Sequence, residues 1–118
     1  MESYRVLLAN EPRLLRGLLS RVLAQVAGLT VVGQETDKAK LSSRVTESEA
    51  DWVIVSMWQN ESLPAFLRDL VSEHPSLCLL GMAPDGSRAR TWSLEGGERR
   101  LNGLTLEEFI ATLRQIGR

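Results

Sequence analysis

The chain has 118 residues, 43% of them hydrophobic and 25% charged, a composition that suits one compact globular domain spanning 1–118. The formal net charge of −1 excludes a general electrostatic attraction to nucleic acid or to anionic lipid. No apolar stretch approaches the roughly 18 residues of a membrane-spanning helix, so no membrane partner is expected. The single cysteine, Cys78, cannot form an internal disulfide, which favours a cytoplasmic location.

In the first part of the chain, short apolar runs alternate with longer helical patterns, as in a parallel sheet covered on both faces. Residues 6–9 predict a buried strand. The apolar positions that follow at helical spacing predict one core-facing helix surface made of Leu14, Leu15, Leu18, Leu19, Val22 and Leu23. Residues 30–33 predict a second strand, and 38–47 predict a weakly amphipathic helix.

The central part of the chain repeats this alternation. An apolar run at 51–56 predicts a third strand that ends at Ser56, and a polar loop follows it. Apolar residues then recur at helical spacing over 63–71 until Pro75 stops the helix. Residues 77–82 predict a fourth buried strand.

The segment that follows interrupts the alternation. Residues 90–94 and 98–101 flank the pair Gly96-Gly97 as two strands flank a tight turn, which predicts a β-hairpin in place of a fourth helix. A short helix at 87–94 followed by a fifth parallel strand is the alternative that regular alternation demands. The sequence leaves both possibilities open.

The final helix has the clearest signals. Thr105 and Glu108 form a capping-box pattern at its start. Its apolar stripe is expected to consist of Leu106, Phe109, Ile110, Leu113 and Ile116.

The first strand with Asn10-Glu11-Pro12 after it, the strand that ends at Ser56, and the segment 101–108 together resemble a receiver domain. Receiver domains are the CheY-like domains of bacterial response regulators in two-component signal transduction. The resemblance covers essentially the whole chain and implies a three-layer α/β/α flavodoxin-like fold with a central parallel sheet. A receiver needs a carboxylate that accepts the phosphoryl group, an acidic pair that holds Mg²⁺, a nearby hydroxyl and a lysine.

The positions that match these groups have lost their chemistry. Ser56 replaces the phosphoacceptor aspartate, and the acidic pair falls either on Asn10 and Glu11 or, one residue earlier, on Ala9 and Asn10. The hydroxyl and lysine positions fall near Met82 and Asn102. The resemblance therefore implies a degenerate phosphorylation pocket of Asn10, Glu11, Ser56, Met82 and Asn102. It implies an atypical pseudo-receiver that is not an enzyme, holds no metal or cofactor, and acts by protein–protein interaction or homodimerisation without phosphorylation.

The candidate interface comes from residue types that are favoured at binding hot spots. Trp58, Trp92, Arg99 and Arg100 are the candidate anchors, with a solvated arginine face as the alternative. Trp58 follows the third strand in a polar loop and is expected to be exposed, whereas Trp52 within that strand is expected in the core.

Two other function classes have weaker support. One is a small flavodoxin-like ligand-binding or catalytic domain that uses the crevice at the carboxyl ends of the strands. The sequence contains neither a glycine-rich phosphate loop nor a nucleophile elbow for it. The other is direct nucleic-acid binding by Arg88, Arg90, Arg99 and Arg100, which the net charge and the lack of a helix-turn-helix pattern disfavour.

Overall fold

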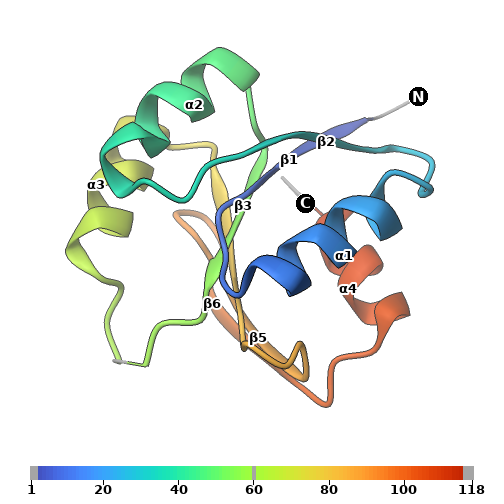
Figure 1. The fold of residues 1–118 in the computed structure, drawn as a ribbon. Coiled ribbons are helices and arrows are strands. Elements are labelled where there is room, and N and C mark those ends of the chain that lie inside the picture. The colour runs from blue at the N-terminus through green and yellow to red at the C-terminus, as the bar shows by residue number, and fades with distance from the viewer. Residues whose placement is uncertain (1–2, 60, 116–118) are drawn as a thin grey trace.

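The computed structural model describes residues 3–59 and 61–115 and has a six-stranded sheet with helices on both faces (Figure 1). The strands are β1 (Tyr4–Leu8), β2 (Leu29–Gln34), β3 (Trp52–Ser56), β4 (Cys78–Met82), β5 (Arg88–Ser93) and β6 (Gly97–Asn102). The helices are α1 (Arg13–Leu23), α2 (Leu41–Ser48), α3 (Ala65–Glu73) and α4 (Leu106–Leu113), with a short 3₁₀ helix at Lys38–Lys40 before α2. Among these described helices, none is both long and apolar enough to cross a membrane.

The sheet is mixed, with strand order β2-β1-β3-β4-β5-β6. Neighbouring strands from β2 to β4 are parallel, whereas β5 is antiparallel to both β4 and β6. The prediction of a parallel sheet is therefore confirmed for four strands and wrong for the last two. The hairpin is confirmed, and the alternative of a helix at 87–94 with a fifth parallel strand is wrong. The hairpin turns at 94–96, and Gly97, the first residue of β6, has a φ of +65°, a conformation that glycine adopts without strain.

Each face of the sheet has its own hydrophobic core, because successive strand residues point to opposite faces. Leu8 and Ile54 point to the face where Leu23 of α1 and Leu113 of α4 pack. The opposite core contains Leu7 and Val53 of the sheet together with residues of α2 and α3 (Leu41, Val45, Leu67, Leu70 and Val71). The architecture is thus α/β and compatible with a three-layer arrangement.

The predicted core face of α1 is only partly right. Leu19 and Leu23 are buried, but Leu14 is 88% exposed and Leu18 is 48% exposed. The apolar stripe spans a wider arc of the helix than the sheet can cover, so its outer edge reaches solvent.

In α4, too, only part of the predicted apolar stripe is buried. The Glu108 N–H donates a hydrogen bond to Thr105 Oγ1 over 3.1 Å, which confirms Thr105 as the N-cap. Phe109 and Leu113 are buried, but Leu106 is 55% exposed, so its assignment to the core is wrong. Ile116, the last predicted member of the stripe, lies outside the described residues.

Candidate functional site

The carboxyl edge of the parallel strands brings together four of the five residues predicted for the degenerate pocket. Ser56 and Met82 are register partners at the ends of β3 and β4. Asn10 and Glu11 follow β1, and the Glu11 N–H donates a hydrogen bond to Ser56 Oγ over 2.9 Å. The edge therefore joins the loop after β1 to the end of β3 through Ser56.

Asn102, the fifth predicted residue, lies farther along the sheet. It pairs with Arg88 at the end of β6. Because β5 is inserted between β4 and β6, one strand separates Asn102 from Met82. A parallel fifth strand would have placed the matched position directly beside β4, and the hairpin prevents this.

The residues at this edge do not fit a Mg²⁺ site, which needs carboxylate oxygens. The Asn10 side chain is fully buried, and neither its Oδ1 nor its Nδ2 has a hydrogen-bond partner among the residues that the structure describes. The exposed Glu11 carboxylate lies 3.5 Å from Arg16 Nη1, which also donates to the Asn10 carbonyl over 2.9 Å. A guanidinium therefore lies where a cation would have to bind. Over residues 3–59 and 61–115, no group of three His, Cys, Asp or Glu side chains is placed to hold a metal ion.

The Ser56 hydroxyl also lacks the surroundings of a nucleophile. A serine attacks efficiently when a base takes its proton. The contact of Ser56 Oγ is the Glu11 backbone N–H, which donates to it and cannot accept that proton. Met82 is buried in the core and has no hydroxyl to offer a phosphoryl group. Ser56 Oγ thus joins two loops of this edge, and within residues 3–59 and 61–115 no hydrogen bond from it to a base is seen.

Trp58 is buried, with 5% of its surface exposed, so the prediction that it is an exposed contact residue is wrong. The ring lies directly on the backbone of β4 at Gly81, where a Cβ atom would come within 2.7 Å of Trp58 Cζ3. Glycine at this strand position makes the close approach of the ring possible.

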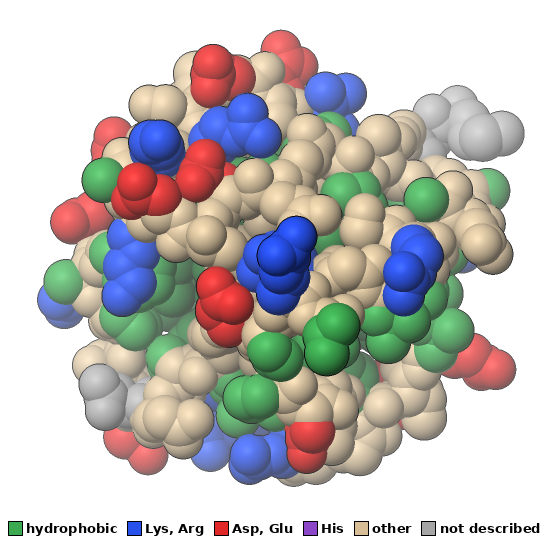
Figure 2. All heavy atoms as spheres, in the orientation of Figure 1, with side chains coloured by type: hydrophobic (Ala, Val, Ile, Leu, Met, Phe, Trp, Pro, Cys, Tyr) green, Lys and Arg blue, Asp and Glu red, His purple; other side chains and the backbone are tan. Residues whose placement is uncertain are grey.

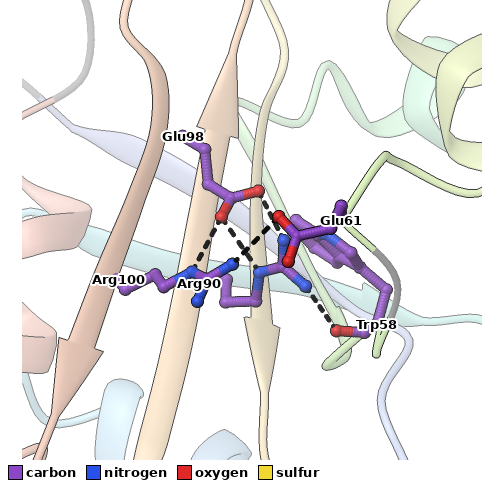
Figure 3. Close-up of polar contacts among 5 residues, drawn as sticks. All are labelled: Trp58, Glu61, Arg90, Glu98 and Arg100. Atoms are coloured by element: carbon purple, nitrogen blue, oxygen red, sulfur yellow. Dashed lines mark hydrogen bonds and ion pairs between the residues drawn. The ribbon is translucent and has the colours of Figure 1, made fainter.

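Arg90 also contacts the indole and joins the loop after β3 to the hairpin (Figure 3). Its Nη1 donates to the Trp58 carbonyl over 2.7 Å, and its guanidinium carbon lies 4.8 Å from the centre of the Trp58 ring. Its Nε and Nη2 donate to the two carboxylate oxygens of Glu98, over 3.2 and 2.6 Å. We name Arg90, Trp58, Glu98, Glu61 and Arg100 together the Arg90 cluster.

The charges within the Arg90 cluster balance. Arg100 Nε donates to Glu98 Oε2 over 3.1 Å, and Arg100 Nη2 lies 3.8 Å from Glu61 Oε2. The hydrogen bond from Arg90, followed by that from Arg100, lowers the pKa of Glu98. Arg100 is thus committed to two carboxylates, which makes it a poorer candidate for a contact with another molecule.

The four arginines of the hairpin do not form one patch. Arg88, Arg90 and Arg100 share one face of the β5–β6 ladder, whereas Arg99 lies on the opposite face, where its Nη1 contacts Gln115 over 3.5 Å. Arg90 is buried as well. These four arginines thus do not form the continuous basic surface that nucleic-acid binding requires.

A groove of about 890 Å³ lies at the amino edge of β3 and β4, at the opposite end of the sheet from Ser56. Trp52, Trp92 and Arg99 help to line it. The expectation that Trp52 belongs to the core is confirmed, and its Nε1 donates to the Leu113 carbonyl over 2.9 Å. Of the predicted anchors, Arg99 and Arg100 are exposed and Trp92 is half-buried.

Sequence reasoning missed the buried ion pair of Arg90, although one signal pointed to it. The observed turn at 94–96 pairs Ser93 with Gly97 and so places Arg90 and Glu98 on one face, in diagonal positions of neighbouring strands, whereas a two-residue turn at Gly96-Gly97 would have placed them on opposite faces. Gly81 inside a strand marks a close approach of another group. Comparison with known proteins found no protein family, no curated protein and no solved structure that matches the chain.

Proposed function

We propose that this chain is a pseudo-receiver: a signalling module that binds proteins and does not itself transfer a phosphoryl group. The order β2-β1-β3-β4 agrees with the first four strands of the flavodoxin-like fold of receivers. The observation that carries the proposal is the hydrogen bond from the Glu11 N–H to Ser56 Oγ. A hydroxyl, held by the loop after β1, stands where a receiver needs a free carboxylate.

The surrounding residues support the same conclusion. An acyl phosphate forms on a carboxylate oxygen, which Ser56 does not have. Asn10 supplies a neutral amide where a metal ligand would be needed, and Arg16 brings a positive charge to the Glu11 carboxylate. Charge repulsion and the lack of carboxylate ligands both oppose metal binding.

The hairpin is the surface that we propose for a protein partner. It replaces the helix that the β-α alternation would place between β4 and the last strand, and β6 forms one edge of the sheet. Exposed edge strands can pair with an extended segment of another chain. Arg99 is exposed and has no ion pair in residues 3–59 and 61–115, so it is the better cationic anchor of this surface.

The absence of receiver chemistry predicts that Mg²⁺ with beryllofluoride, a phosphoryl mimic, leaves the carboxyl edge unchanged. Amide chemical shifts of Glu11, Ser56 and Met57 are measured during the titration, with an active receiver treated in parallel as the positive control. We expect no saturable shift at these amides. A saturable shift of the Glu11 and Ser56 amides would show a working phosphoryl pocket and contradict the proposal.

A further inference from the structure

Three large apolar side chains on one side of the molecule are exposed, namely Leu14 and Leu18 of α1 and Leu106 of α4. Single exposed leucines are ordinary on protein surfaces, but groups of them mark interaction sites. Figure 2 shows hydrophobic side chains gathered on the face where α1 and α4 lie next to each other in Figure 1.

Leu14 and Leu18 lie on the flank of α1 that is turned away from β2. Each residue advances by about 100° around a helix, which puts Leu14 and Leu18 on the flank beside Leu15 and opposite Arg16. Arg16 Nε donates to Gln34 Oε1 of β2 over 2.8 Å, which fixes the direction of its flank. The leucine flank must therefore face the other way, toward α4.

Leu106 and Ile110 lie on the flank of α4 that faces α1. Arg114, one turn after Ile110, donates from Nη2 to the carbonyl of Ala27, just beyond α1, over 2.6 Å. Gln115, on the opposite flank, contacts β6. Leu14, Leu18, Leu106 and Ile110 thus line the junction between the two helices, and we name them the leucine seam.

Gly17 gives a second, independent indication that another chain packs here. It lies in the middle of α1, on the outer surface beside Leu14 and Leu18, where glycine weakens a helix relative to alanine. A Cβ atom on Gly17 would meet nothing within 4 Å, so the fold of this chain does not require the glycine. The missing side chain leaves room for the close approach of another backbone.

The charges beside the seam favour a second copy of the chain as the occupant. Helix α1 carries three arginines and no acidic residue, and Arg13 and Arg21 lie on its outer surface beside the seam, whereas Arg16 lies on the far flank. Helix α4 carries no basic residue, and its Glu107 lies on the outer surface beside the seam, whereas Glu108 lies on the far flank. Two copies related by a two-fold axis can place α1 of each against α4 of the other, which makes every contact twice. Packing α1 against α1 would instead bring arginines together.

We propose that the leucine seam is a self-association surface, on which α1 of one protomer packs against α4 of its partner. This inference rests on the proposed function of a protein-binding module and names a second copy of the chain as a partner. It does not depend on the chemistry at Ser56, so a monomeric protein would overturn the dimer while leaving the beryllofluoride result unchanged.

Sedimentation of the full chain over a range of concentrations tests the proposal. The wild-type chain is expected to form a dimer, and Leu14→Gln/Leu18→Gln is expected to raise the dissociation constant at least about tenfold. Leu94→Gln is the matched control, because Leu94 is 55% exposed on the hairpin turn, away from the seam. Circular dichroism checks that each variant is folded. A wild-type chain that is monomeric at every concentration, or a dimer that Leu14→Gln/Leu18→Gln leaves intact, overturns the proposal.

A charge exchange distinguishes a second copy from a different partner. Arg13→Glu/Arg21→Glu and Glu107→Lys should each weaken self-association, because both place like charges across the interface. Mixing the two variants should restore a dimer of one chain of each kind, since opposite charges again face each other at both contacts. Failure of the mixture to associate contradicts the pairing of α1 with α4.

Discussion

Replacing Arg90 with leucine should lower the free energy of unfolding by about 3 kcal/mol, the lower end of the range for breaking a buried ion pair. The variant leaves the Trp58 carbonyl without its donor and removes the cation from the face of the indole. Glu98 loses a bidentate partner but keeps Arg100 and is partly exposed, which limits the loss.

Urea denaturation measures this difference, with Arg88→Leu as the matched control. Arg88 lies on the same strand and face but is exposed, so its replacement should change the free energy of unfolding by no more than about 0.5 kcal/mol. Equal effects of the two substitutions would show that the Arg90 cluster contributes no specific stability.

Replacing Gly81 with alanine should also destabilise the fold, by about 2 kcal/mol, because the added methyl group overpacks the core. The new Cβ atom would lie 2.7 and 2.9 Å from two ring atoms of Trp58 and 3.0 Å from Met57 Cα. Arg90 also contacts the ring and donates to the Trp58 carbonyl, so a shift of the ring would disturb these contacts.

A double-mutant cycle isolates this clash. In a Trp58→Leu background the large ring is gone, and Gly81→Ala should then cost clearly less than in the wild-type chain. Gly17→Ala makes the same chemical change where space is open and should raise the free energy of unfolding of the dilute monomer by about 0.5–1 kcal/mol. An unchanged cost of Gly81→Ala in the Trp58→Leu background would rule out the clash.

Together these contacts couple the loop after Ser56 to the hairpin. Trp58 follows Ser56 by two residues, and its ring and carbonyl are held by Gly81 of β4 and Arg90 of β5. In this fold Trp58 therefore fixes the hairpin to the loop that follows Ser56.

Periodicity predicted most of the secondary structure correctly, because buried strands and amphipathic helices impose their own spacing on the sequence. The Gly96-Gly97 pair predicted the hairpin because glycines mark a tight turn, and a turn depends only on residues that are neighbours in the sequence. The direction of β5 and its insertion beside β4 could not be read in the same way, since strand order depends on contacts between distant segments. As a consequence, Asn102 was expected nearer to Met82 than it lies.

The predictions of exposure were wrong where the solvent exposure of one residue depends on another residue far along the chain. Trp58 lies in a polar loop and was expected at the surface, but Gly81, more than twenty residues later, makes space for its ring. Leu14 and Leu18 fit a helical apolar face, yet the sheet covers only the part of α1 that contains Leu19 and Leu23. Apolar spacing shows which side of a helix can be buried, and the structure shows that part of this side of α1 remains exposed to solvent.

The most direct test of the account is whether the chain accepts a phosphoryl group. The purified protein is incubated with acetyl phosphate and Mg²⁺, and its intact mass is measured beside that of an active receiver treated in the same way. The account predicts that the chain keeps its unmodified mass while the control gains an acid-labile phosphoryl adduct. A stable, acid-labile adduct of one phosphoryl group on this chain would contradict the account, because it would require the carboxylate chemistry that Ser56 lacks.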